Sequence, residues 1–126
     1  MSDWDKAPSA EVMLQSWNMV PLVVADLQGT VLIVSSAALS LFGWERSEEL
    51  VGRPITDFVA PEERVRAAHN VARVLAGELT GPIQYRALRK SGDVFAIEAT
   101  ADLIRDDDRS PTGLSILIHE MTTEQR

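Results

Sequence analysis

The chain has 126 residues, 45% hydrophobic and 25% charged, which is enough for one packed domain and too few for two. It contains no cysteine, which excludes disulfides, thiolate metal sites, cysteine nucleophiles and thioether-bound cofactors. The net charge of -7 argues against direct nucleic-acid binding. No apolar run approaches the roughly 18 residues of a bilayer span, and the first residues are acidic where a secretory signal is basic. We therefore expect a cytoplasmic protein with no membrane segment.

The amino-terminal part divides into a polar arm and a short helix. Residues 1–9 are polar and are expected to be flexible. From Ala10 on, apolar residues recur at the i, i+3, i+4, i+7 spacing of one helix face, which predicts a flanking helix over residues 10–19. Its apolar stripe consists of Ala10, Met13, Leu14 and Trp17.

Two β-branched segments follow, over residues 22–25 and 30–34, and predict a hairpin around a turn from Asp26 to Gly29. Ser35 or Ser36 can cap a short helix, which Gly43 ends in the left-handed conformation. Further short turns are expected near residues 47–51 and 55–59.

The longest helix is expected to begin at Pro61 and to run to about Gly77, because proline favours the first helical position and Glu62 and Glu63 follow it. Apolar residues at helical spacing predict its buried stripe. The members of this stripe are Val65, Ala68, Ala72 and Leu75.

Beyond residue 81 the hydrophobic period falls to two, which predicts three strands. In the first, Ile83, Tyr85 and Ala87 alternate with polar residues, and Ser91-Gly92 turns the chain into a half-buried strand over residues 95–103. A polar loop over residues 106–113 leads to a last strand, residues 114–121, that is apolar on both faces. This order of helices and strands predicts an antiparallel α+β domain.

Four ordered motifs resemble the Per-Arnt-Sim (PAS) sensor family. The first joins Asp26 and Gly29 to a polar cap, paired alanines and Gly43, and the second is the Ser-Glu-Glu-Leu-Val-Gly-Arg segment at 47–53 before the helix start at 61–64. The third is Tyr85-Arg86 before a turn at 89–92, and the last is the exit segment at 120–122. In two places the chain departs from the family, with Ser35 where Asn is usual and Glu120 where Asp is usual.

The resemblance implies a PAS-like domain over residues 20–121, with a five-stranded antiparallel sheet, helices on one face and the N-terminal flanking helix. Residues 122–126 would begin a linker to an output domain such as a histidine kinase, cyclase or transcription regulator. It further implies a regulatory sensor, as in two-component signalling, and not an enzyme. A small ligand or partner bound between helix and sheet would shift the last strand, and Glu120 and Thr122 would carry the signal out.

Small side chains on the longest helix predict space between that helix and the sheet. If the space is open, it is a ligand pocket; if it is filled, the domain is a ligand-free dimerisation or protein-interaction module. Cavity volume separates these alternatives. The pocket candidates are Phe42, Phe58, Ala68, Ala72, Ile97 and Ile116.

His69 is the candidate for cofactor binding, because an inward imidazole could hold haem iron and make the domain a gas or redox sensor. In haem-binding relatives the histidine stands about one turn earlier, where this chain has Arg66. We therefore expect no cofactor, while haem and noncovalent flavin stay open; flavin bound through a cysteine adduct is excluded. We expect no metal site, and Asp26, His69 and Glu120 lack the spacing of a catalytic set.

The last strand also predicts a homodimer. Leu117 and Met121 point away from the face that packs on the core, so another apolar surface must cover them. One short helix is too small to cover a whole sheet face, and a second copy would complete the cover. The interface candidates are Met13, Leu14, Trp17, Leu117 and Met121.

Overall fold

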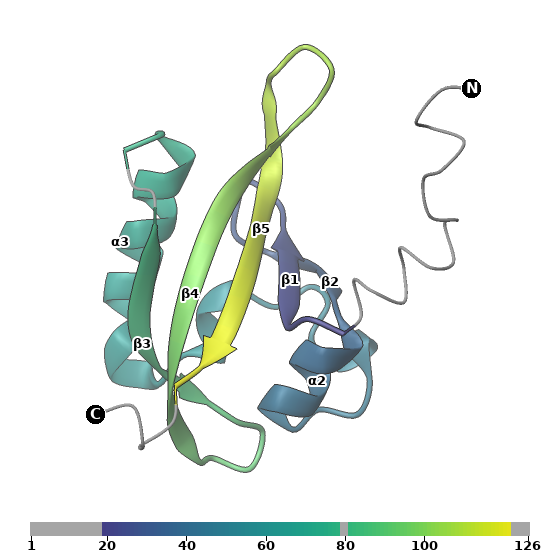
Figure 1. The fold of residues 1–126 in the computed structure, drawn as a ribbon, viewed down its shortest axis with the longest axis vertical. Helices are drawn as coiled ribbons and strands as arrows, with labels where there is room; N and C mark the ends of the chain where they lie inside the picture. The colour runs from purple at the N-terminus through teal and green to yellow at the C-terminus, as the bar shows by residue number, and fades with distance from the viewer. Residues whose placement is uncertain (1–18, 79–80, 122–126) are drawn as a thin grey trace, which may run out of the picture.

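The computed structural model describes residues 19–78 and 81–121. Its five-stranded antiparallel sheet has the order β2-β1-β5-β4-β3 (Figure 1). This architecture confirms the predicted α+β class. The strands are β1 (Leu22–Ala25), β2 (Val31–Val34), β3 (Pro82–Leu88), β4 (Val94–Arg105) and β5 (Pro111–Glu120). The helices are α2 (Ser36–Phe42), α3 (Arg64–Leu75) and the 3-10 helices η2 (Ser47–Glu49), η3 (Ile55–Phe58) and η4 (Pro61–Glu63).

The predicted flexible arm (1–9), most of the flanking helix (10–19) and the exit linker (122–126) lie outside the described residues. Of the residues assigned to them, Met13, Leu14, Trp17 and Thr122 are therefore not placed. The polar loop before β5 is shorter than expected, because pairing of β4 with β5 already begins at Pro111.

The β1–β2 hairpin forms where the sequence predicts it. The carboxylate of Asp26 accepts hydrogen bonds from the backbone N–H groups of Gln28 and Thr30, each at 2.9 Å. Gly29 has φ of 80°, a conformation that costs glycine little because it has no Cβ. Asp26 thus stabilises a turn, which is a structural role.

The helix α2 is capped at both ends by the residues that the sequence indicates. Ser35 is the N-cap, and its hydroxyl accepts a hydrogen bond from the Ala38 N–H. Gly43, with φ of 78°, ends the helix. The caps orient α2 so that Ala38 and Phe42 are buried against the sheet.

The prediction for the buried face of α3 is wrong. Val65 is 84% exposed, and Ala68 and Ala72 are also exposed. The buried residues of α3 are Ala67 and Val74. Both stripes have helical spacing, so periodicity alone could not choose between them. The observed rotation brings Asn70 within hydrogen-bond distance of Tyr85 on β3.

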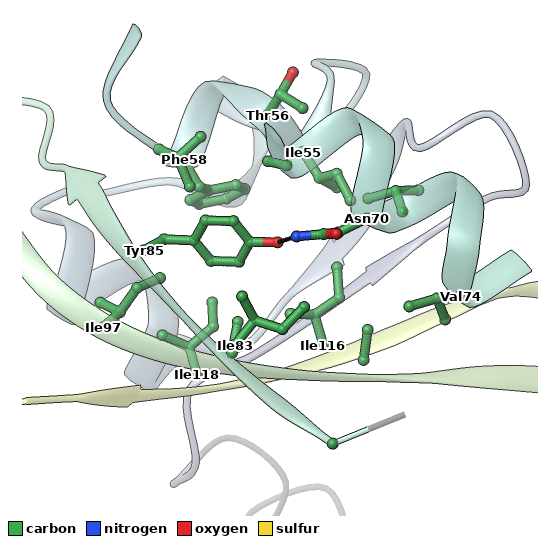
Figure 2. A pocket seen from close by; sticks show the side chains of 16 residues that line it. Ile55, Thr56, Phe58, Asn70, Val74, Ile83, Tyr85, Ile97, Ile116 and Ile118 are labelled. Atoms are coloured by element: carbon green, nitrogen blue, oxygen red, sulfur yellow. Dashed lines mark hydrogen bonds between the residues drawn. The ribbon is translucent and has the colours of Figure 1, made fainter. Parts of the chain in front are cut away.

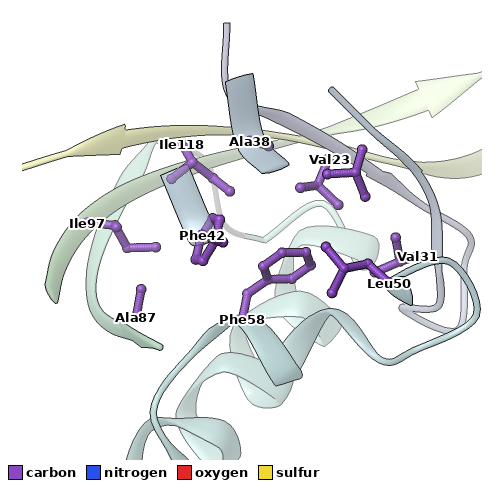
Figure 3. Packing of buried hydrophobic residues seen from close by; sticks show 10 residues of the cluster. Val23, Val31, Ala38, Phe42, Leu50, Phe58, Ala87, Ile97 and Ile118 are labelled. Atoms are coloured by element: carbon purple, nitrogen blue, oxygen red, sulfur yellow. The ribbon is translucent and has the colours of Figure 1, made fainter. Parts of the chain in front are cut away.

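The core lies between one face of the sheet and the helices (Figure 3). Phe42 is fully buried at its centre, and its ring meets the rings of Phe58 and Phe95 edge-on at centroid distances of 4.7 and 5.4 Å. Val23 and Ile118 supply the sheet side of this cluster. All the helices that contact the core thus cover the same face, as expected.

Candidate functional site

A cavity of about 80 Å³ lies between α3, η3 and the inner face of the sheet. Figure 2 shows Phe58 and Ile55 on the helical side, and Ile97, Ile116 and Ile118 on the sheet side. The other lining residues are Thr56, Val59, Ala67, Asn70, Val71, Val74, Gly81, Ile83, Tyr85, Ala99 and Ala101. The cavity is therefore apolar over most of its wall.

The structure divides the six pocket candidates of the sequence into two groups. Phe58, Ile97 and Ile116 line the cavity. Phe42 packs behind Phe58 in the core, and Ala68 and Ala72 lie on the exposed face of α3, so assigning these three to the pocket is wrong. The error for the two alanines follows from the rotation of α3.

One polar pair faces this apolar cavity. The side-chain amide of Asn70 donates a hydrogen bond of 3.0 Å to the hydroxyl of Tyr85, whose ring lies between α3 and the isoleucines of the sheet (Figure 2). The hydroxyl of Thr56 points away from Tyr85. Sequence analysis missed Asn70, although it lies between Ala67 and Val74 on the buried face; the alternation of β3 did place Tyr85 on the side of Ile83.

Charged residues at the start of α3 contact Tyr85 and its neighbours on β3 from outside the cavity. Arg66 stacks on the Tyr85 ring at 4.5 Å and donates a hydrogen bond of 2.7 Å to the Gln84 carbonyl. The Glu63 carboxylate accepts hydrogen bonds from Arg66 and from the Arg86 N–H, the latter at 2.7 Å. The hydrogen bond from the Arg86 N–H is the largest influence on the pKa of Glu63 and lowers it; desolvation opposes this, and Arg66 lowers it further, so that the pKa lies below its ordinary value. These contacts join α3 to β3.

The exit of β5 is connected to the core through Arg89. Its guanidinium forms an ion pair with Glu120 at 3.2 Å, stacks on Phe95 at 3.7 Å and donates to the Leu41 carbonyl. The longer carboxylate of Glu120 thus still forms an ion pair. Phe95 contacts Phe42, which contacts Phe58 at the wall of the cavity.

The outer face of the sheet carries exposed aliphatic residues. Leu117 and Ile33 are each 48% exposed, and β1 supplies Leu22 opposite Leu117 and Val24 opposite Ile33. The exposure of Leu117 indicates that its side chain points away from the core, as its alternation in β5 predicts. Met121 is half-buried.

Comparison with known proteins identifies the fold family. A model of the PAS fold matches residues 11–121. The chain belongs to the PAS family. Comparison with curated proteins by sequence gave no match.

Solved structures of PAS domains share the same architecture. The PAS domain of a protein from Colwellia psychrerythraea has a TM-score of 0.77 at 20% identity, covering 91% of this chain and 99% of its own. A light-oxygen-voltage domain studied with a flavin analogue has a TM-score of 0.75 at 18% identity, covering 93% and 88%. The light state of the Aureochrome1 blue-light receptor domain has 0.72 at 16%, covering 88% and 90%. At these identities the likeness shows the PAS fold alone.

The cavity of this PAS domain does not fit haem bound through His69. The His69 side chain lies on the exposed face of α3, so the alternative of an inward imidazole that holds haem iron is wrong. The rotation that turns Asn70 toward the cavity leaves its neighbour His69 exposed to solvent. His119 is exposed on β5, where it pairs with Glu98 on the outer face of the sheet.

Flavin does not fit either in this conformation. Sites for molecules of drug size have volumes of about 300–1,000 Å³, well above the 80 Å³ of this cavity. A flavin ring also needs several hydrogen-bond partners, whereas the described lining offers one polar pair facing inward. Within residues 19–78 and 81–121, no cluster of acidic or histidine side chains could hold a metal ion, and no helix is long and apolar enough to cross a membrane.

Proposed function

We propose that this PAS domain is a regulatory sensor that binds a small ligand between α3 and the sheet. One observation carries the proposal: an apolar cavity of about 80 Å³ with a single polar pair, Asn70 and Tyr85, facing into it. Protein interiors are close-packed, and a void loses the dispersion contacts of its wall. A cavity of this size beside an oriented polar pair is therefore suited to a guest molecule.

The signal would leave through β5. Ile116 and Ile118 line the cavity and lie four and two residues before Glu120 on the same strand. A second connection runs from the cavity wall through the packed phenylalanine rings of the core to Arg89, which forms an ion pair with Glu120. A ligand that favours one packing of these side chains would shift the population of conformations at the end of β5. We propose that a cytoplasmic output domain, such as a histidine kinase, cyclase or transcription regulator, receives this change.

A cavity-filling substitution tests the sensor proposal. Ala101→Leu adds three carbons at the cavity wall, and we expect it to leave the melting temperature unchanged or raised and to abolish binding of toluene as an apolar probe. Ala72→Leu makes the same change on the exposed face of α3 and should preserve toluene binding. Thermal melts and NMR titration with toluene measure both effects.

The opposite result would contradict the sensor proposal. If Ala101→Leu destabilises the domain by about 1–3 kcal/mol, as overpacking of a filled core does, and the unsubstituted chain binds no toluene, the cavity closes in solution. The domain would then act as an interaction module.

Dimerisation is the second candidate function, and the outer face of the sheet favours it. Ile33, Val24, Leu22 and Leu117 form an apolar surface across three neighbouring strands, β2, β1 and β5. Exposed apolar surfaces of this kind mark interaction sites. We propose that a second copy and the stripe of Met13, Leu14 and Trp17 cover it. Ligand binding and dimerisation use opposite faces of the sheet, so the two functions are compatible.

A further inference from the structure

The wall of the cavity carries no charge. Among the described residues that line it, every side chain is apolar except those of Thr56, Asn70 and Tyr85. The guanidinium of Arg66, which stacks on Tyr85, is already engaged by Glu63 and the Gln84 carbonyl. An ion in the cavity would lose its hydration without gaining a counter-ion, at a high cost in free energy. The site therefore favours a neutral ligand.

The polar pair offers one hydrogen-bond donor and one acceptor. Asn70 donates to the Tyr85 oxygen, and within the described residues the hydroxyl hydrogen of Tyr85 and the amide oxygen of Asn70 have no other partner. If the amide is turned over, Tyr85 donates to Asn70, and the pair offers the amide N–H and the phenol oxygen instead. Either arrangement complements a group that both accepts and donates a hydrogen bond.

The volume of the cavity limits the size of the apolar body of the ligand. A cavity of about 150 Å³ in another protein takes up benzene, and this one has about 80 Å³. A short chain or one small ring is therefore the upper limit, and a ring requires the wall to expand. Isoleucines from three strands, Ile83, Ile97 and Ile116, would contact that body.

We infer that the cavity selects a small neutral molecule with an apolar body and one hydroxyl or amide group, and that Asn70 and Tyr85 recognise this group. The inference rests on the proposed sensor function and goes further, because it names the class of ligand and the residues that determine specificity. The apolar wall supplies the affinity, and the pair supplies discrimination, since a site that hydrogen-bonds a polar group disfavours the analogue that lacks it.

Three matched aromatic probes test the inference: phenol, toluene, in which a methyl group replaces the hydroxyl, and benzoate, which is charged. For the unsubstituted chain, we expect NMR titration to give a Kd for phenol about tenfold below that for toluene, which corresponds to about 1.4 kcal/mol. Benzoate should not bind measurably. Tyr85→Phe should bring the ratio of the toluene Kd to the phenol Kd to about one, with the toluene Kd changed less than threefold.

Control variants separate recognition from packing. Thr56→Val removes a hydroxyl that lines the cavity but points away from Tyr85, so it should leave the tenfold preference for phenol intact. Asn70→Leu replaces the other member of the pair and should also abolish the preference, which keeps the test available if Tyr85→Phe does not fold.

The outcomes distinguish this inference from the proposed function. Equal binding of phenol and toluene by the unsubstituted chain overturns the recognition role of the pair and leaves the sensor proposal standing. The same holds if Tyr85→Phe keeps the preference for phenol over toluene. If that variant does not fold, an unchanged preference in Asn70→Leu has the same meaning. Tighter binding of benzoate than of phenol and toluene overturns the inference that the site selects a neutral ligand. Failure of both phenol and toluene to bind overturns the sensor proposal itself and this inference with it.

Discussion

The hydroxyl of Ser35 forms hydrogen bonds to three backbone groups in two segments of the chain. It accepts hydrogen bonds from the N–H of Leu22 at 2.9 Å and of Ala38 at 3.2 Å, and it donates to the Val20 carbonyl at 2.6 Å. Ser35 is fully buried. The hydroxyl therefore caps α2 and also joins that helix to the start of β1. Ser35 thus forms the cap despite the absence of the asparagine that is usual in the family.

Ser35→Ala tests this role. The substitution removes a helix cap and leaves the partly buried N–H of Leu22 without its side-chain partner, and such losses cost about 1–3 kcal/mol. We expect the free energy of unfolding, measured by urea denaturation, to fall by about 2 kcal/mol. Ser40→Ala, an exposed change on the same helix, should alter it by less than about 0.5 kcal/mol. Equal effects of the two substitutions would contradict the bridging role of Ser35.

At the scale of elements, Glu63 connects the start of α3 to β3. Its carboxylate, at the end of η4, accepts the Arg86 N–H of β3 and pairs with Arg66, which stacks on Tyr85. A neighbouring ion pair between Glu62 and Arg86 makes a second connection between the same two elements. Groups outside the cavity therefore connect the same two elements that carry Asn70 and Tyr85.

The lowered pKa of Glu63 predicts a pH dependence of stability. Because the pKa is lower in the folded state than in the unfolded state, the carboxylate stabilises the fold above its ordinary pKa of 4.5, and this stabilisation is lost as the pH falls through the folded value. We expect Glu63→Gln to cost about 1 kcal/mol at pH 7 and to be nearly neutral at the lowest pH at which the fold persists. Urea denaturation between pH 3 and pH 7 measures the difference, and a cost that does not change with pH would contradict the assignment.

At the scale of the whole molecule, the sheet has two apolar faces and the described helices cover one. The inner face forms the core and the cavity, whereas Leu117 and Ile33 on the outer face are each 48% exposed. Covering both side chains would favour association by the hydrophobic effect. The sequence places a further apolar stripe, with Trp17, before the described residues.

We therefore expect the chain to form a homodimer. Leu117→Glu places a charge in the centre of the proposed interface and should give monomers in sedimentation velocity, as should deletion of residues 1–18. Val65→Glu, at an exposed site on α3, should leave the dimer unchanged. Sedimentation of the unsubstituted chain as a monomer at high concentration would contradict the homodimer, as would a Leu117→Glu variant that remains dimeric.

The sequence by itself determined the elements whose signals are local. The turn at Asp26 and Gly29, the caps of α2 at Ser35 and Gly43, and the strands with a period of two all form where the residues predict them, except that β5 begins earlier, at Pro111. Each depends on bonds between residues a few positions apart or on simple alternation, so no knowledge of distant contacts is needed. The order of these elements and the motifs along the chain were sufficient to recognise the PAS fold.

Only the tertiary structure decided which face of α3 is buried and therefore what the site contains. Two stripes of α3 have helical spacing, and the exposed one, with Val65 at its start, has the more apolar pattern. The buried one contains Asn70, whose polarity makes it a poor candidate for the interior until Tyr85, fifteen residues away on β3, supplies a partner. Local periodicity carries no record of such a pairing, because the energy that favours it arises only when helix and strand meet.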